Sequence, residues 1–90
     1  MPTTRFISTS RELGAALRAE RKARGLTLQQ VADKVSLRRQ TVAALESGEN
    51  ASLHTVMAVL AVLGMGLHVI DRLPGLLDEF DLSATTVPRP

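Results

Sequence analysis

Glycine residues divide the middle of this chain into short segments, each with the apolar spacing of a helix. Apolar residues recur every three or four positions before Gly25, Gly48 and Gly64, as they do in helices that end at a glycine. The predicted helices span residues 11–24, 28–35, 40–47 and 53–63. None approaches the roughly 20 apolar residues of a membrane span. The chain is therefore predicted to be an all-α domain of four or five short helices, the fifth depending on the segment after residue 74.

The second and third predicted helices are separated by a very short turn. Thr27 precedes Gln30 by three residues, a spacing in which the hydroxyl caps a free amide and the glutamine reaches back to the N–H of the cap. Ser36 and Leu37 alone then separate the second helix from the residues that open the third. Helices joined so tightly lie across one another, so the outer face of the third helix can enter a groove about 12 Å wide.

The fourth predicted helix is apolar on nearly all of its surface. It carries Val56, Val59, Leu60 and Val62 among other apolar residues, and such a helix must be covered on two sides. The domain covers one side, and a second copy of the chain is the simplest cover for the other. A chain of 90 residues without cysteine has a marginal core and no disulfide to support it. We therefore expect a homodimer.

A short strand is predicted to follow the fourth helix. The segment Leu67–Arg72 contains the β-branched pair Val69 and Ile70, which favours extended backbone. A lone strand is not stable in water, and the stretch Arg5–Ser8 could pair with it from the same chain or from the second copy. The candidate residues of the dimer interface are Val59, Val62, Leu67, Val69 and Ile70.

Composition divides the chain into three parts. These are an N-terminal extension, a helical domain and a tail, at residues 1–9, 10–73 and 74–90. In the tail, Leu76–Leu82 alternates apolar and acidic residues, which fits either one more helical turn or a peptide that folds on a partner. Residues 83–90 are rich in Ser, Thr and Pro, and we expect them to be disordered.

Basic and acidic residues are segregated along the chain. The formal net charge is +2, but residues 1–39 hold nine basic and three acidic residues, a net charge of +6, whereas residues 40–90 carry −4. The basic half suits a polyanion, and two solvated surfaces of opposite sign are the alternative. We expect Arg18, Lys22 and Arg24 to be solvated surface charges rather than phosphate contacts.

Side chains suited to recognising base edges lie where the third helix begins. Arg38 and Arg39 precede its predicted first turn, and Gln40 and Thr41 follow. Arginine can bond O6 and N7 of guanine together, and glutamine can bond N6 and N7 of adenine. These residues predict contact with the major groove, and a solvated turn is the alternative.

The segment from Leu26 to Gly48, LTLQQVADKVSLRRQTVAALESG, resembles the helix-turn-helix of the Cro/phage-repressor (XRE) family. The shared pattern is an alanine in the second helix, the turn, Gln-Thr-Val and Leu-Glu-x-Gly at the same spacing. The resemblance covers residues 10–64 and implies a lambda-repressor-like fold with a short C-terminal strand, and a possible N-terminal one, at the dimer interface. The whole chain most resembles the HipB-like antitoxins, dimeric repressors that pair with a HipA-type kinase toxin.

This resemblance implies a function and a set of partners. The expected protein is a cytoplasmic, nucleoid-associated bacterial repressor that binds a palindromic double-stranded DNA operator, controls its own operon and neutralises a HipA-type serine/threonine kinase. A stand-alone XRE-family regulator and a protein-interaction adaptor with weak DNA binding are the alternatives. No secretion signal is visible in Met1–Ser10, which fits the expected location.

The resemblance also assigns roles to individual residues. It implies a structural ion pair between Arg21 and Glu46. It implies base contacts by Arg38, Arg39, Gln40 and Ala43. It implies contacts to the DNA backbone by Thr27, Gln29, Thr41 and Ser47.

The chain departs from the family pattern at two positions. Leu28 stands where a phosphate-contacting glutamine is common, so Gln29 or Gln30 must supply that contact if it is made at all. Ser36 stands at a turn position that is usually glycine, and a left-handed backbone there costs a serine about 1 kcal/mol. We therefore expect direct base contact to be concentrated in residues 38–40.

Other classes of protein find little support in the sequence. An enzyme is disfavoured because no glycine-rich phosphate loop, catalytic triad or carboxylate pair is recognisable. His54 and His68 have no cysteine or carboxylate cluster to complete a metal site, so no metal, cofactor or small-molecule ligand is expected. Phe6 and Phe80 are the only aromatic residues, too few for the stacking used in single-stranded RNA recognition.

Overall fold

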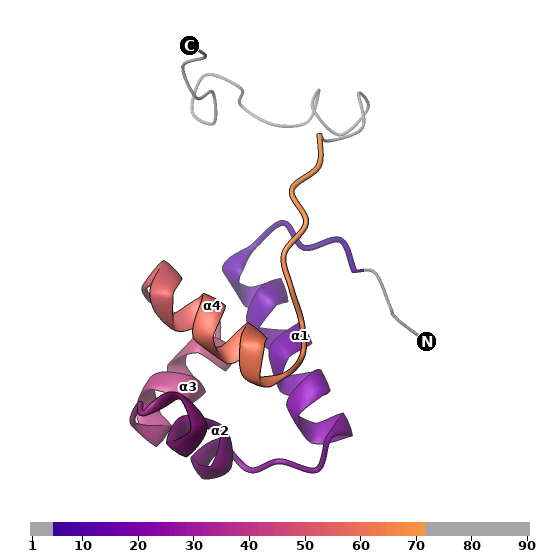
Figure 1. Cartoon of the computed structure of the whole chain (residues 1–90). Coiled ribbons are helices and arrows are strands. Elements are labelled where there is room, and N and C mark those ends of the chain that lie inside the picture. The colour runs from indigo at the N-terminus through magenta and orange to yellow at the C-terminus, as the bar shows by residue number, and fades with distance from the viewer. Residues whose placement is uncertain (1–4, 72–90) are drawn as a thin grey trace.

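The computed structural model describes residues 5–71, and within this range the chain forms four α-helices and no strand (Figure 1). They are α1 (Ser10–Ala23), α2 (Leu28–Val35), α3 (Arg39–Glu46) and α4 (Leu53–Val62). Helix α2 packs against both α3 and α4, and α1 packs against α3. The predicted all-α fold is confirmed, while the tail that was expected to begin at residue 74 lies outside the described residues.

Helix α1 begins one residue earlier than predicted because Thr9 caps it. The amide of Glu12 donates to Thr9 Oγ1 at 3.1 Å, and Glu12 Oε1 accepts from the amide of Thr9 at 3.0 Å. This reciprocal pair is a capping box. The hydroxyl of Ser10 donates instead to the carbonyl oxygen of Gly48 at 3.0 Å. The start of α1 is thereby attached to the loop that follows α3.

The connection from α2 to α3 forms as predicted. The amide of Gln30 donates to Thr27 Oγ1 at 3.0 Å, and Gln30 Oε1 accepts from the amide of Thr27 at 2.8 Å. Ser36 ends α2 with φ 57° and ψ 40°, which is the left-handed region. The amide of Leu37 then donates to the carbonyl of Ala32 at 2.9 Å. This single left-handed residue turns the chain into α3.

Helix α3 begins at Arg39 rather than Gln40. Arg38 is its N-cap, in an extended conformation with φ −81° and ψ 149°. Its carbonyl accepts the amides of Thr41 and Val42 at 3.0 and 3.3 Å, which closes the first turn around Arg39. The prediction that both arginines precede the helix is therefore wrong for Arg39.

All four helical segments contribute to one hydrophobic core. Its buried side chains are Leu17, Val31, Ala32, Val42, Leu45, Val59, Leu60 and Leu63. Val59 is only 1% exposed, because its face of α4 turns inward onto α2. This candidate interface residue therefore packs within its own chain and offers no surface to a second copy.

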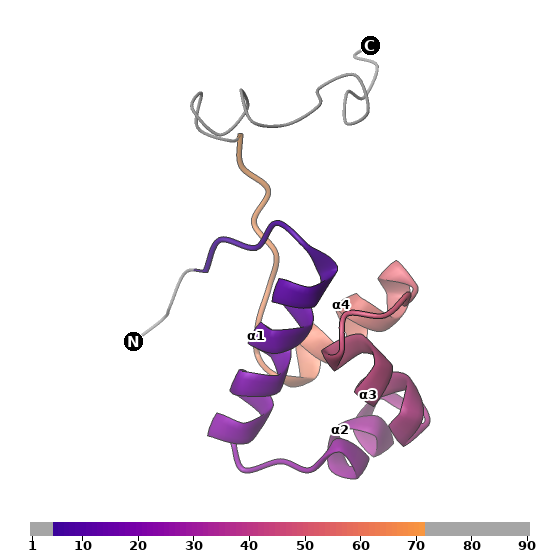
Figure 2. The same cartoon turned by 180° about the vertical axis from the view of Figure 1, so that it is seen from behind.

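Residues 67–71 of the predicted strand, the part that the structure describes, do not form a strand in the single chain. Residues 66–71 and 5–8 have no regular secondary structure, and no backbone hydrogen bond joins the two segments. A strand needs a neighbour to bond with. The segment after α4 leads toward the end of the molecule where α1 begins (Figures 1 and 2). Its apolar side chains are exposed, Val69 by 94%.

Candidate nucleic-acid interface

The first turn of α3 presents three polar side chains to solvent. Arg38, Arg39 and Gln40 are exposed, and neither arginine forms an ion pair with any residue between 5 and 71. The opposite side of α3 is held in the core by Val42 and Leu45. The amphipathic spacing of α3 thus determines which side of the helix faces outward. At the N-terminal end of that side lie the guanidinium groups of Arg38 and Arg39.

The remaining α3 candidates extend this surface toward the C-terminal end of the helix. Thr41 and Ala43 are half-buried, and Ser47, the C-cap, is exposed. The methyl group of Ala43 cannot form a hydrogen bond, but it can contact the methyl group of thymine. The structure therefore places the α3 candidates at an accessible surface of one helix.

The polar side chains at the N-terminus of α2 form local hydrogen bonds. Gln30 Oε1 is engaged by the capping box with Thr27, and Gln29 Nε2 donates to Asp33 Oδ1 at 2.8 Å. Leu28 packs against the core. The amide group of a glutamine carries two N–H donors, so Gln29 keeps one of them, and the capping bond uses none of those of Gln30. Neither bond therefore removes the donors that a phosphate contact would use.

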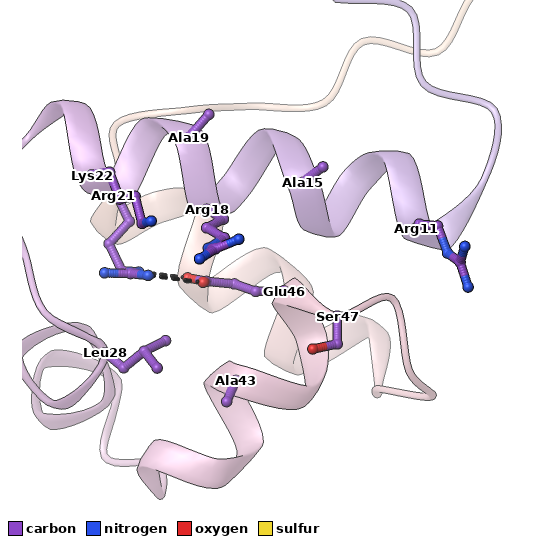
Figure 3. A pocket seen from close by; sticks show the side chains of 10 residues that line it. All are labelled: Arg11, Ala15, Arg18, Ala19, Arg21, Lys22, Leu28, Ala43, Glu46 and Ser47. Carbon is purple, nitrogen blue, oxygen red and sulfur yellow. Dashed lines mark hydrogen bonds and ion pairs between the residues drawn. The ribbon is translucent and has the colours of Figure 1, made fainter.

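Arg21 and Glu46 form the expected ion pair and attach α3 to α1 (Figure 3). Arg21 Nε lies 2.7 Å from Glu46 Oε2, and Nη2 lies 3.1 Å from Oε1. Arg21 Nη1 also donates to the carbonyl of Leu26 at 2.8 Å. The side chains are 10% and 6% exposed. This bidentate geometry is the strong form of the interaction, and it fixes α3 and the start of α2 relative to α1.

Gly14 allows α1 and α3 to approach closely, a role that was not predicted from the sequence. A Cβ atom at this position would collide with the backbone carbonyl oxygens of Leu45 and Glu46. Glycine is unfavourable inside a helix by about 1 kcal/mol relative to alanine. Its presence in the middle of α1 was the signal that a backbone passes nearby. Gly14 therefore determines how closely α3 can pack against α1.

An open hollow lies between α1 and α3 (Figure 3). The ion pair Arg21–Glu46 lies within it, and Leu28 borders it from the start of α2. Helix α3 contributes Ala43 and Ser47, both candidate DNA contacts. Helix α1 contributes Arg11, Ala15, Arg18, Ala19 and Lys22. The hollow therefore joins the surface of α3 to a basic face of α1.

The two histidines are exposed and separate from this surface. His54 lies in the first turn of α4, and His68 lies in the segment after it. Residues 5–71 contain no group of three His, Cys, Asp or Glu placed to hold a metal ion. In the same part of the chain, no helix has both the length and the apolar character needed to cross a membrane.

Solved structures with this fold are similar over most of their length. The HipB–O4 20mer complex matches with a TM-score of 0.71 at 23% sequence identity, over 76% of this chain and 97% of that chain. The HipA–HipB–O2–O3 complex and a structure described as MDT protein match with the same score, identity and coverage. At this identity the likeness establishes a shared fold. No curated protein has a sequence that matches this chain significantly.

The sequence itself matches a family as well. The helix-turn-helix family model aligns with residues 17–70, which is more than half of the chain and includes the second half of α1, all of α2, α3 and α4, and the segment after α4. The region matched contains the capped α2, the left-handed turn and the exposed start of α3. The chain therefore belongs to the helix-turn-helix family and is a DNA-binding regulator of the XRE type.

Proposed function

We propose that the protein is a homodimeric repressor that places two copies of α3 in successive major grooves of a palindromic operator. The observation that carries this proposal is the exposed start of α3, whose arginines form no ion pair with residues 5–71, held in position by the ion pair Arg21–Glu46. In a dimer of this kind the two helices are one DNA turn, roughly 34 Å, apart. Binding at its own promoter would shut off its own operon.

We propose two sets of contacts, with the roles that the family resemblance implies. The proposed base contacts are Arg38, Arg39, Gln40 and Ala43. The proposed contacts to the DNA backbone are Thr27, Gln29, Thr41 and Ser47. The first set determines which sequence is bound, and the second orients the domain on the duplex. Of the second set, Gln29 donates one N–H of its amide group to Asp33, which leaves the other N–H for a phosphate.

Exposed apolar residues support dimerisation. Leu67, Val69 and Ile70 are 52–94% exposed in the single chain, and Val62 is half-buried. Large apolar side chains exposed close together in the sequence favour an interaction site. The interface is therefore proposed to comprise these four residues, with pairing between chains supplying the hydrogen bonds of the strand.

A selection experiment tests sequence-specific DNA binding. The full chain is incubated with a pool of 30-base-pair duplexes of random central sequence, and bound DNA is amplified and sequenced. We expect a palindromic consensus. The double variant R38A/R39A is expected to keep its fold and to lose preference for that consensus by roughly five- to 150-fold for each guanine contact removed. The variant K34A serves as a control, because Lys34 is an exposed cation on α2 outside the proposed contacts.

The outcomes test the assignment of base contacts and separate a regulator from an adaptor. A consensus that R38A/R39A still prefers as strongly as the unaltered chain does would refute the assignment of base contacts. Absence of any enriched sequence would favour the alternative, a protein-interaction adaptor with weak DNA binding. Such an adaptor would also show a flat dependence of DNA affinity on salt, because few phosphates would be neutralised.

We further propose an antitoxin role, with a HipA-type serine/threonine kinase as the partner. Support comes from the shared fold with HipB, one of whose structures is a complex with HipA. Co-expression with a kinase encoded beside this gene tests the proposal. A stable complex that elutes as one peak, with loss of kinase activity, is the expected result. A gene without such a neighbour, or a kinase that elutes separately and remains active, would contradict the antitoxin role and favour the alternative, a stand-alone XRE-family regulator.

A further inference from the structure

Three cations of α1 form a row along the hollow between α1 and α3. Arg11, Arg18 and Lys22 are seven and four residues apart, so they lie on one face of the helix. All three are exposed and line the hollow, and α3 lines its other side (Figure 3). We refer to these three residues as the α1 row. Arg24, which the sequence grouped with Arg18 and Lys22, is not among the lining residues.

The charge of the α1 row is not neutralised by the described part of the chain. The ion pairs of residues 5–71 are Arg21–Glu46 and Arg24–Glu20, and neither includes a member of the row. Glu46 is the only acidic residue lining the hollow, and Arg21 neutralises it. The row therefore adds three positive charges to a hollow whose single carboxylate is already paired, so a ligand that enters it should be anionic.

The spacing of the cations suits an extended anion. Apart from the paired Arg21, the other residues of α1 that line the hollow are Ala15 and Ala19, and α3 contributes Ala43. These small side chains carry no charge and no hydrogen-bonding group. Seven and four residues along a helix correspond to about 10 and 6 Å, so the three charges are spread along α1 and are complementary to a chain of phosphates rather than to a single carboxylate.

We propose that the α1 row binds the phosphodiester backbone of the operator, next to the phosphates contacted through Ser47. This inference rests on the proposed function and extends the proposed DNA contacts from α2 and α3 to α1. Ser47 and Ala43 form one wall of the hollow and the row forms the other, so a DNA strand at the edge of the groove occupied by α3 passes beside both. The row thereby binds phosphate where the apolar side chain of Leu28 cannot. Arginine suits this task because its guanidinium group can bind a phosphate with two hydrogen bonds.

The test is a salt titration with the double variant R18Q/K22Q in the full chain. The probe is a fluorescein-labelled 30-base-pair duplex of mixed sequence, because phosphate contacts do not depend on the bases. Binding is followed by fluorescence anisotropy between 50 and 300 mM KCl, on the order of the range in which counterion release is measured. We expect the slope of log affinity against log salt to fall by about one for each contact removed. Near 0.1 M salt this corresponds to roughly tenfold weaker binding per contact.

A matched control and a second measurement keep the result specific. The variant R24Q removes a cation at the C-cap of α1 that is paired with Glu20 and does not line the hollow, and its slope should equal that of the unaltered chain. The ratio of affinities for the selected consensus and the mixed duplex should be unchanged in R18Q/K22Q, whereas R38A/R39A lowers it. Circular dichroism and urea unfolding verify that each variant is folded.

Two results would overturn the inference. One is a slope for R18Q/K22Q equal to that of the unaltered chain, and the other is a loss in R24Q that is equal for each charge removed, which would indicate a general effect of net charge. If the proposed function is wrong, the selection experiment gives a different result: the unaltered chain shows no sequence preference. The salt titration with the mixed duplex still measures the contribution of the α1 row to DNA binding in that case.

Discussion

Ser36 adopts a left-handed backbone conformation, the only non-glycine residue between residues 5 and 71 to do so. This conformation costs a non-glycine residue roughly 1–2 kcal/mol, and glycine avoids that cost but loses more entropy on folding. We predict that Ser36→Gly stabilises the domain by up to about 1 kcal/mol, or a rise in Tm of roughly 4–8 °C. Calorimetry measures this change. Ser36→Ala, which keeps the Cβ atom, is the control, and a Tm below that of the unaltered chain in the glycine variant would contradict the argument.

Arg21 and Glu46 are each costly to remove alone because both are buried. Replacing Arg21 with methionine leaves the carboxylate of Glu46, 6% exposed, without its partner and frees the carbonyl of Leu26. We predict a loss of about 3–5 kcal/mol in the free energy of unfolding. The double variant R21M/E46L should recover most of that loss, since apolar replacements of a buried pair are often neutral. Urea unfolding of R21M, E46L and R21M/E46L measures the coupling energy. A loss in the double variant equal to the sum of the losses in the two single variants would exclude coupling.

At the scale of secondary structure, α1 and α3 are held at a distance that Gly14 permits. We predict that Gly14→Ala destabilises the domain by about 1–3 kcal/mol, because the added methyl group overlaps the carbonyls of Leu45 and Glu46. DNA affinity should fall as well, since α3 must shift away from α1. Gly66→Ala is the matched control, because a Cβ atom there meets nothing within 4 Å. Thermal unfolding and anisotropy measure the two effects, and an unchanged Tm in the Gly14 variant would show that the helices can separate freely.

The sequence predicted the elements whose signals are local. The Thr27–Gln30 capping box, the turn at Ser36 and the glycine-ended helices depend on residues within four positions of one another, and all form as expected. The expectations that the single chain does not bear out involve contacts between distant segments. Val59 was assigned to an interface because α4 is apolar on every side, and only packing against α2 shows which side is inside. The strand after α4 depends on a neighbour that no local pattern can supply.

The same distinction applies to the candidate site. Arg38, Arg39 and Gln40 could be located from the family pattern because their exposure follows from the amphipathic spacing of α3. The basic face of α1 could not be located in this way. Arg18 and Arg24 look equivalent in the sequence, yet one lines the hollow and the other pairs with Glu20. That difference appears only when α1 and α3 are placed side by side.

At the scale of the whole molecule, DNA binding by two copies of α3 requires the chains to be joined. Val69 is 94% exposed, so Val69→Asp removes no contact within the single chain. At a dimer interface the same change would bury an unpaired carboxylate, which is strongly unfavourable. We predict that the variant is monomeric in sedimentation equilibrium at concentrations where the unaltered chain is a dimer. Its affinity for the selected consensus should fall by roughly 10²–10⁴-fold, because the two half-sites are no longer bound by linked domains.

The control for this prediction is another exposed apolar residue outside the proposed interface. Leu53, at the start of α4, is 71% exposed, and Leu53→Asp introduces the same charge on a surface that the proposed strand does not use. It should remain dimeric and bind the consensus normally. Dissociation by both variants would move the interface onto the outer face of α4, which also carries Met57, 45% exposed. A dimeric Val69 variant would instead exclude the segment after α4 from the contact between chains, and the spacing of the two α3 helices would then have to be set by α4 alone.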